Sequence, residues 1–469
     1  MKKWMALCLV LAMTLCLLAC SGSGKAKEDP NALQVGYGRV DITPDYPMAI
    51  AGSAATRISE GCLDPLYFTT IAIKQAEELF LIVTMDLVGA YSEYTEALQM
   101  ALSNAAEIPK NHVILNATHT HASVSIRNIE SENCPKYREE LAVWAVESAT
   151  AAVADLSPAE VWYGSTQAEG MAWVRHYKMA DGTYAGANFG SFSSGIVGHA
   201  AEADTEMQLV RFVRPAEDKK DVVLMNFPAH ATMCDDPMLS ADFPGPARQY
   251  VAEQTDTLVA YFIAGAGNQV PSSRIPEENF STNYQVYGEE LGRIAVACLG
   301  NMTKLEDTQL RFQQKTYIGK SNKEDLDRLG DALKVDAIWS QVGGRGTDAG
   351  KKAAKEAGFS SVYEVTAILN RSHFQEKRTM ELVALSVGDV GFIFAPYEMF
   401  GPNAMTIKQE SPYAMTFIVT CSQNHDGYLP STYGCEIRCY EAQITKFTPG
   451  TAEILASEYV TLLTEMKNK

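Results

Sequence analysis

The sequence predicts an α/β fold in which mixed β-sheets are flanked by helices. Three observations lead to this prediction. Short apolar segments alternate with segments of helical periodicity along most of the chain, an order typical of α/β proteins. The apolar segments are nearly continuous, which indicates strands covered on both faces. The chain has 469 residues, 46% hydrophobic and 20% charged, enough for a large folded core.

The individual elements follow from these patterns. Predicted strands cover 79–89, 112–118, 222–230, 257–265, 381–396 and 413–421, and predicted helices cover 93–107, 137–156, 284–304 and 451–466. Residues 320–360 are polar and punctuated by glycine, which predicts a helical insertion on the surface. No internal repeat is visible. We therefore expect one domain of catalytic size over 33–469.

The first twenty residues are expected to be a leader and not part of the fold. Lys2 and Lys3 precede an apolar run of signal-peptide length. The run ends in Leu17–Cys20, which resembles a bacterial lipobox and implies cleavage before Cys20 and lipidation of that cysteine. An ordinary signal peptide or a short membrane anchor is the alternative. Residues 21–32 have the composition of a flexible tether. The expected location is extracytoplasmic, either lipid-anchored to the bacterial cell membrane or secreted.

Charge and cysteine usage exclude several classes of partner. The formal net charge is −18, which argues against nucleic acid and against electrostatic docking to anionic lipid. Any membrane association should come from the N-terminal lipid. The cysteines are dispersed and form no Cys-x-x-Cys motif, so a zinc site built on thiolates is not expected.

Histidines and acids follow several of the predicted strands. His119 and His121 follow the strand over 112–118, His230 follows 222–227, and Glu398 follows 391–395. Ligands of open α/β sheets bind beyond the carboxyl ends of the strands, and imidazole and carboxylate are good zinc ligands. On the pair alone, His119 and His121 could equally be strand-end residues satisfied by hydrogen bonds.

Eight short segments of the chain carry a family resemblance. In chain order they are "VGYGRVDITP" (35–44), "LDPLYFTTIAI" (63–73), "THTH" (118–121), "WVRHY" (173–177), "FPAHAT" (227–232), "SADFPG" (240–245), "APYEMF" (395–400) and "GYLPSTYGCEIRCYE" (427–441). Together they resemble the neutral/alkaline, non-lysosomal ceramidase family over nearly all of the mature chain. Each motif is short, and their number and order carry the resemblance. It implies the fold of the ceramidase N-terminal catalytic domain.

The resemblance also implies a zinc centre and its surroundings. Zn²⁺ would be held by four side chains, namely His119, His230, Glu398 and Tyr428. His121, Arg175 and Tyr440 would line the open side of the metal as catalytic residues, with Arg175 and Tyr440 donating to an oxyanion and His121 moving protons. Without the resemblance, the simplest interpretation of Arg175 is an ion pair on the surface. Tyr428 and Tyr440 would then be residues at the edge of the core whose hydroxyl groups form hydrogen bonds.

Two more acids have open interpretations. Asp242 could be a partner of a metal ligand or the N-cap of a helix that follows it. Asp86 could be a turn residue.

One departure from the family bears on the substrate. Ceramidases carry a Gly-Asp-Val-Ser-Pro turn whose serine acts near the scissile amide, and here Val270 stands in that place within Gly267–Pro271. Ser272 and Ser273 follow just past the proline. The C-terminal β-sandwich module that accompanies the ceramidase catalytic domain is not expected.

The resemblance implies a small-molecule or lipid-like substrate, and the function that it implies is hydrolysis of an N-acyl amide, ceramide-like bond by zinc-activated water. The alternatives are a zinc hydrolase of the same family that acts on another envelope or glycan-related substrate, and a non-catalytic binding lipoprotein.

Overall fold

The computed structural model describes residues 29, 31–52, 57–89, 92–127, 132–186, 195–275, 278 and 280–469. The expected leader over 1–20 lies outside these residues, as does the tether over 21–32 except for 29, 31 and 32. The chain divides into two compact units, Met1–Ala32 and Leu33–Lys469, and every described strand and helix belongs to the second unit. None of the described helices is long and apolar enough to cross a bilayer.

The first large sheet has the strand order β6-β5-β4-β1-β7. Its strands are β1 (Gln34–Asp41), β4 (Tyr67–Gln75), β5 (Glu78–Met85), β6 (Val113–Ala117) and β7 (Ser157–Pro158), and its helices are α2 (Ser92–Ala106) and α3 (Cys134–Ala154), with the short turn η1 (Lys110–His112) before β6. Only β5 and β6 are parallel neighbours.

The second large sheet has the order β15-β14-β13-β8-β17. Its strands are β8 (Glu160–Gln167), β13 (Glu206–Val213), β14 (Val222–Phe227), β15 (Leu258–Ile263) and β17 (Thr303–Lys304), and its helices are α4 (Pro244–Thr255) and α5 (Tyr284–Leu299). The predicted strand over 222–230 ends at Phe227 because Pro228 cannot donate to the ladder. Helix α5 begins at Asn283, whose side chain accepts hydrogen bonds from the amides of Gln285 and Val286.

The third large sheet has the order β18-β19-β20-β22. Its elements are β18 (Leu310–Lys320), β19 (Lys377–Val387), β20 (Val390–Phe394), β22 (Met415–Val419), α9 (Gly401–Glu410) and α12 (Thr451–Lys467). The predicted single strand over 381–396 is wrong, because it is the hairpin of β19 and β20. The chain reverses at Gly388, whose φ of +53° is unfavourable for a residue with a side chain.

All three sheets contain the same arrangement of elements. An antiparallel hairpin is followed by a helix and then by a strand parallel to the second strand of the hairpin: β4-β5-α2-β6, β13-β14-α4-β15 and β19-β20-α9-β22. The sequence shows no repeat, so this threefold topology comes from the structure alone. The mixed sheets flanked by helices agree with the predicted fold class.

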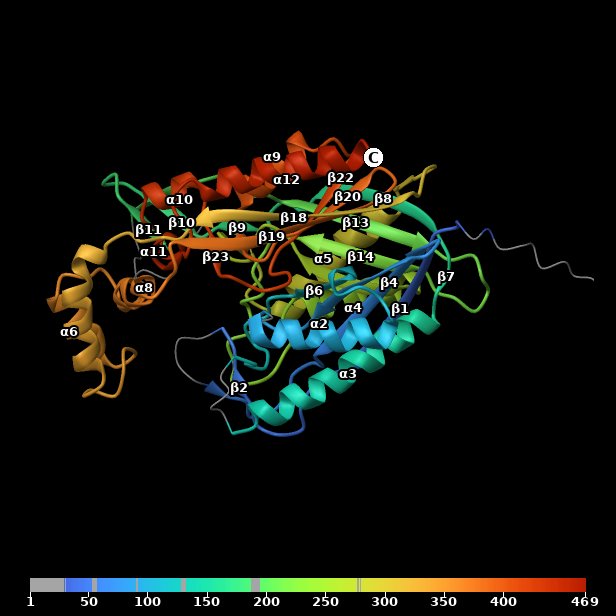
Figure 1. Cartoon of the computed structure of the whole chain (residues 1–469). Helices are drawn as coiled ribbons and strands as arrows, with labels where there is room; N and C mark the ends of the chain where they lie inside the picture. The colour runs from blue at the N-terminus through green and yellow to red at the C-terminus, as the bar shows by residue number, and fades with distance from the viewer. Residues whose placement is uncertain are drawn as a thin grey trace, which may run out of the picture. The chain divides into compact units, whose positions relative to one another are not determined.

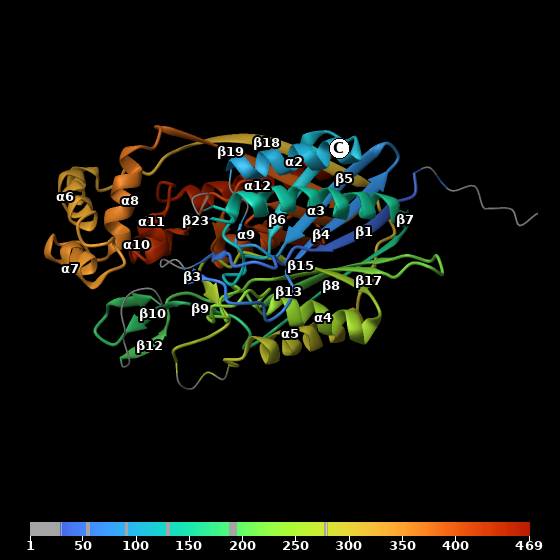
Figure 2. The same cartoon turned by 90° about the horizontal axis from the view of Figure 1, so that it is seen from below.

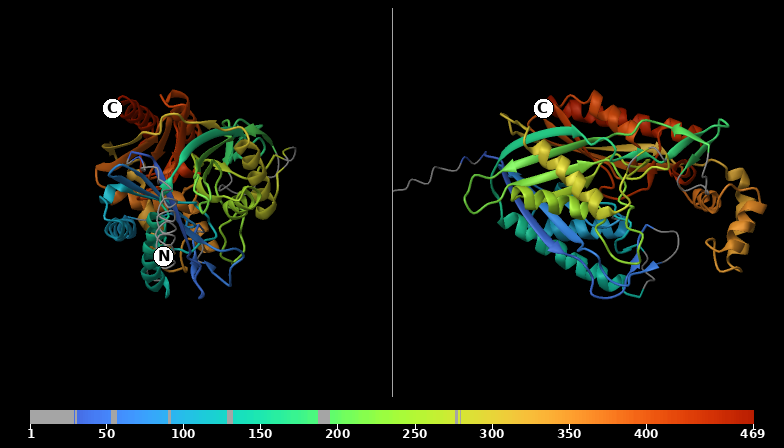
Figure 3. Two further views of the ribbon diagram at one scale, coloured as in Figure 1. Left: turned by 90° about the vertical axis from the view of Figure 1, so that its right-hand side faces the viewer. Right: turned by 180° about the vertical axis from the view of Figure 1, so that it is seen from behind.

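The inner faces of the three sheets share one apolar core. Ile82, Phe262 and Phe417 come from different sheets and belong to the same buried cluster, in which the rings of Phe262 and Phe417 lie 6.1 Å apart. Burying such a side chain contributes about 1.5–3 kcal/mol. On its outer face each sheet packs against its own pair of helices. Figure 3 shows these helices on three different sides of the sheets.

Smaller elements gather at one end of the three sheets (Figure 1). They are β2 (Ala49–Ile50), β3 (Arg57–Ile58), β9 (Trp173–Val174), β10 (His176–Met179), β11 (Tyr184–Gly186), β12 (Ile196–His199), β16 (Gln269–Val270), β21 (Glu398–Met399), β23 (Tyr428–Leu429), α10 (Thr432–Glu436) and α11 (Tyr440–Ile444). After β22, the described residues 420–469 form β23 and helices, and no β-sandwich.

The predicted insertion over 320–360 lies between β18 and β19. It contains η2 (Leu326–Arg328), α6 (Leu329–Trp339) and α7 (Asp348–Glu356), and α8 (Val362–Ser372) follows it. These helices have a core of their own, which includes Trp339 and Phe359. Figure 2 shows α6, α7 and α8 together beyond the ends of β18 and β19.

Candidate metal centre

Buried polar side chains join the three sheets where their strands end. The hydroxyl of Thr84 donates to the carbonyl of Tyr261 at 2.7 Å, Asn226 Nδ2 donates to that of Ile418 at 2.9 Å, and Asn116 Nδ2 donates to that of Thr420 at 2.5 Å. Satisfied polar groups in a core specify one arrangement of the elements that they join. The segments after β6, β14, β20 and β22 are thereby held close together.

His119 lies two residues after β6 with a strained backbone. Its φ is +65°, a region that costs free energy for a residue with a side chain and is found most often at functional sites. Its Nδ1 donates to the carbonyl of Val88 at 2.6 Å. With that proton on Nδ1, a neutral imidazole presents the lone pair of Nε2 to the neighbouring residues. Burial acts to lower the pKa of His119, but Cys421 and Glu398 outweigh it and raise the pKa well above its ordinary value. Without a metal, Nε2 therefore binds a second proton.

His230 follows β14 and is oriented in the same way. Its Nδ1 donates to the carbonyl of Ala266 at 2.7 Å, which leaves Nε2 as an acceptor. Burial, and then the charge of Arg175, lower the pKa of His230 to about 4. The imidazole is therefore neutral at ordinary pH, which is the form that binds metals.

Glu398 lies on β21, which pairs with β23 so that Glu398 and Tyr428 are direct neighbours. Its Oε2 lies 3.0 Å from His230 Nε2 and 3.3 Å from His119 Nε2. Burial acts to raise the pKa of Glu398, but His119 and further imidazoles outweigh it and hold the pKa well below its ordinary value. The carboxylate is therefore ionised although it is buried.

His121 lies as close to this group as its members lie to one another. Its Nε2 is 3.3 Å from His119 Nε2, and its ring packs against Gly52, where an added Cβ would lie 2.4 Å from the imidazole. Burial, together with His119 and His230, holds the pKa of His121 well below its ordinary value. His121 is partly exposed, so it can contact both the buried group and a bound molecule.

Tyr428 and Tyr440 stand beside the histidines. The Tyr428 ring stacks on His230 with centroids 6.3 Å apart and planes at 24°, and Tyr440 meets Tyr428 edge-on at 5.9 Å. On its far side, Tyr440 packs against Tyr363 of α8 with centroids 4.9 Å apart. The helices between β18 and β19 therefore help to place Tyr440.

Arg175 is buried, so its interpretation as a surface ion pair is wrong. Its Nε and Nη2 donate to Glu441 Oε1 at 2.6 and 2.5 Å, and Nη2 also donates to the carbonyl of Gly267 at 3.0 Å. The guanidinium carbon lies 5.5 Å from the centre of the Tyr428 ring. The other oxygen of Glu441 lies 2.9 Å from His176 Nε2. The sequence gives one signal for Glu441, its place directly after Tyr440.

Cys421 and His425 also reach this group, although neither is among the expected zinc ligands. His425 Nε2 lies 3.0 Å from Glu398 Oε1. Potential ligand atoms of His119, Cys421 and His425 lie within 4.8 Å of one another, as do those of His119, His121 and His230. All seven described cysteines are free.

The turn at Val270 has a structural role. Val270 pairs with Trp173 through β16 and β9. The buried side chain of Gln269 accepts from the amide of Asp204 at 2.7 Å and donates to the carbonyl of Pro228 at 2.7 Å. The hydroxyl of Ser273 accepts from the amide of Ile275 at 3.1 Å, so it is used within its own turn.

The two acids with open interpretations have structural partners. Asp242 Oδ2 accepts from the amides of Met233 and Cys234, each at 2.8 Å. The N-cap of α4 is Phe243, so the N-cap interpretation of Asp242 is wrong. Asp86 forms a buried bidentate ion pair with Arg248 at 2.7 and 2.5 Å.

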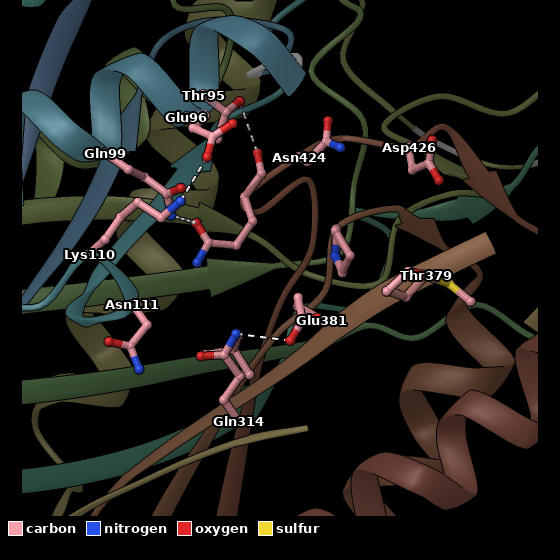
Figure 4. A pocket seen from close by; sticks show the side chains of 14 residues that line it. Thr95, Glu96, Gln99, Lys110, Asn111, Gln314, Thr379, Glu381, Asn424 and Asp426 are labelled. Carbon is pink, nitrogen blue, oxygen red and sulfur yellow. Dashed lines mark hydrogen bonds and ion pairs between the residues drawn. The ribbon is translucent and has the colours of Figure 1, made fainter. Parts of the chain in front are cut away.

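A separate cavity of about 440 Å³, lined mostly by polar side chains, lies between α2 and the paired strands β18 and β19. Figure 4 shows that its side chains pair with one another, as Lys110 does with Glu96 at 2.8 Å and Gln314 with Glu381 at 2.9 Å. Asn424 and Asp426 line it, whereas His425 between them contacts Glu398. The segment 423–426 therefore separates this cavity from the histidines.

Comparison with known proteins identifies the fold. No protein-family model matches the chain, and no curated protein sequence matches it. Two solved structures are similar. The first, a ceramidase complexed with C2, has a TM-score of 0.66 and 16% identity, over 93% of this chain and 75% of that one. The neutral ceramidase from Pseudomonas aeruginosa has a TM-score of 0.66 and 15% identity, over 94% of this chain and 75% of that one. The resemblance to neutral ceramidases is thus confirmed for the fold.

Proposed function

We propose that the chain is a zinc-dependent hydrolase that cleaves the N-acyl amide bond of a ceramide-like substrate. One observation carries the proposal. His119 Nε2 and His230 Nε2 both face Glu398 Oε2, at 3.3 and 3.0 Å. The Nδ1–H of each ring donates a hydrogen bond to a backbone carbonyl. As bare acceptors, the two Nε2 atoms and Glu398 Oε2 would repel one another, so a cation lies between them, either a proton on His119 Nε2 or, in its place, a metal ion.

The donor set fits zinc. Imidazole nitrogen and carboxylate oxygen bind Zn²⁺ at about 2.0–2.2 Å in a tetrahedron, which separates neighbouring ligand atoms by about 3.3 Å. His119, His230 and Glu398 would hold the ion, and Tyr428, which is paired with Glu398 across β21 and β23, would supply a fourth ligand. Bound there, zinc would polarise a carbonyl and lower the pKa of a water molecule.

The neighbouring residues have roles that follow from their contacts. Glu441 and the carbonyl of Gly267 fix the Arg175 guanidinium beside Tyr428, where it can donate to the oxygen that becomes negative as an amide is attacked. Tyr440, held between Tyr428 and Tyr363, can donate a second hydrogen bond. His121 is partly exposed, and its lowered pKa keeps the imidazole neutral, so it can accept a proton and return it.

Val270 favours a second candidate, a hydrolase of the same fold that acts on another acylated or glycan-related compound. The side chain of Val270 cannot donate a hydrogen bond. The nearby hydroxyl of Ser273 accepts a hydrogen bond from the amide of Ile275. A substrate that needs a serine at this turn would be cleaved slowly. A third and separate candidate is a lipoprotein that binds its ligand and does not turn it over.

A substrate panel separates these functions. The purified chain is incubated with a short-chain ceramide labelled on its acyl group, and in parallel with simple esters, other N-acyl amides and glycosides. Release of labelled acid from ceramide that stops with a chelator and returns with zinc supports the first candidate. Zinc-dependent turnover of another compound, with ceramide intact, supports the second. Ligand retention without turnover across the panel contradicts both hydrolase candidates.

A further inference from the structure

Glu398 presents its two carboxylate oxygens to two different groups of side chains. Oε2 faces His119 and His230, whereas Oε1 faces His425, whose Nε2 lies 3.0 Å away. The side chain of Glu398 is only 6% exposed and that of His425 only 7%. A carboxylate in this position can bind one cation through each oxygen.

Cys421 is a second donor close to His425. It lies two residues after β22, and a ligand atom of Cys421 lies within 4.8 Å of those of both His119 and His425. The residue is 1% exposed. A buried thiol with no cation nearby stays protonated, and a metal deprotonates the thiol that it binds.

The backbone of Cys421 is strained in the same way as that of His119. Its φ is +54°, against +65° at His119, a conformation that is unfavourable for a residue with a side chain. Each of the two residues lies two positions after an edge strand, β6 or β22, of a different sheet, and their ligand atoms lie close together. Neighbouring backbone bonds retain the conformation, since the carbonyl of Cys421 accepts from the amide of Ala117 and its amide donates to the carbonyl of Tyr397.

We propose that the centre holds a second divalent cation, bound by Glu398 Oε1, His425 Nε2 and Cys421 Sγ and bridged to the first cation by the Glu398 carboxylate. Thiolate, imidazole and carboxylate together suit zinc. Two metals that share a carboxylate lie about 3.5–4 Å apart, and Glu398 stands between the two groups of donors. The inference rests on the proposed zinc centre and extends it.

Zinc stoichiometry tests the proposal without measuring activity. The full-length chain is stripped of metal, saturated with zinc and freed of excess, and zinc per polypeptide is measured by mass spectrometry. The expected result is two zinc ions in the wild type and one in both His425→Ala and Cys421→Ser. The matched controls are His112→Ala, a histidine stacked on Phe80, and Cys298→Ser, a buried cysteine of the α4–α5 core, and both should keep two.

Each other outcome overturns the proposal in a recognisable way. One zinc in the wild type that persists in His425→Ala shows that His425 only orients Glu398, and it leaves the first site intact. Two zinc ions that persist in both variants place the second ion elsewhere. No zinc in the wild type overturns the proposed zinc centre as well.

Cobalt provides a readout that does not depend on how well the variants bind zinc. Co²⁺ bound by a thiolate has a near-ultraviolet charge-transfer absorption that Co²⁺ on nitrogen and oxygen ligands lacks. The wild type should show this band and Cys421→Ser should lose it, while both keep the visible cobalt absorption of the first site. Absence of the band in the cobalt-loaded wild type contradicts the proposal. Circular dichroism of each variant establishes that it is folded.

Discussion

His230 Nε2 lies 3.0 Å from Glu398 Oε2, although the two residues are 168 positions apart in the chain. His230 follows β14 of the second sheet, Glu398 follows β20 of the third, and His119 follows β6 of the first. These side chains therefore come together only when all three sheets are assembled. Single substitutions test each residue through the property that its own contacts determine.

Arg175→Lys should impair turnover and leave the metal in place. Lysine keeps the charge but loses the fork that contacts Glu441 and Gly267 together. Loss of a donor to an oxyanion lowers kcat by about 10²–10³-fold. Steady-state kinetics on the substrate found in the panel measure this, alongside zinc content. A rise in KM with kcat unchanged would show that Arg175 only binds the substrate.

Asp86→Asn should destabilise the fold strongly. The substitution leaves Arg248 buried without its charged partner, which costs about 3–5 kcal/mol. The control is Asp235→Asn, because the Asp235 side chain is 98% exposed in its ion pair with Arg57 and such pairs contribute about 0–1 kcal/mol. Urea unfolding compares the two variants. Equal losses would mean that the Asp86–Arg248 pair does not support the fold.

Glu441 should make stability depend on acid pH. Burial acts to raise its pKa, but Arg175 and His176 outweigh burial and hold the pKa below its ordinary value. A glutamate whose pKa is lower in the folded than in the unfolded state stabilises the fold when the pH lies above the unfolded-state pKa of about 4.3. This stabilisation is lost as the pH falls below that value, towards the pKa of the folded state. Glu441→Gln should flatten the acid side of the profile of unfolding free energy against pH. Parallel profiles for the two proteins would contradict this assignment.

Cys20→Ser should release the protein from membranes. We propose that the lipid on Cys20 is the anchor, because the net charge of −18 does not favour binding to anionic lipid. Fractionation of cells that express each form, followed by immunoblotting, measures the distribution. Retention of Cys20→Ser in the membrane fraction, resistant to high salt, would favour the short apolar leader itself as the anchor.

The sequence identifies the elements of the fold better than their arrangement. Apolar runs located β5, β6, β14, β15 and β22, but the run over 381–396 hid a hairpin, because only Gly388 and Asp389 separate two apolar strands. The threefold topology was also hidden. Each sheet carries different residues at equivalent places, so no repeat remains in the sequence.

The sequence pointed to the side chains that converge on Glu398 where a motif marked them, and it missed those that tertiary contacts alone bring there. "THTH" and "FPAHAT" pointed to His119 and His230, and the structure brings both to Glu398. Cys421 and His425 belong to no recognised motif. They reach the centre because the backbone turns at Cys421 into a conformation that side-chain patterns do not predict. Glu441 was missed for a related reason, since burial of its partner Arg175 is a tertiary property.

Zinc retention in histidine variants tests the central claim most directly. Wild type, His119→Ala, His230→Ala and the control His112→Ala are purified in parallel, dialysed against metal-free buffer and analysed for zinc by mass spectrometry. Because His119 and His230 supply two of the converging acceptor atoms, the wild type and His112→Ala should retain zinc, and the other two variants should lose it. Zinc content in His119→Ala and His230→Ala equal to that of the wild type would contradict the proposed centre.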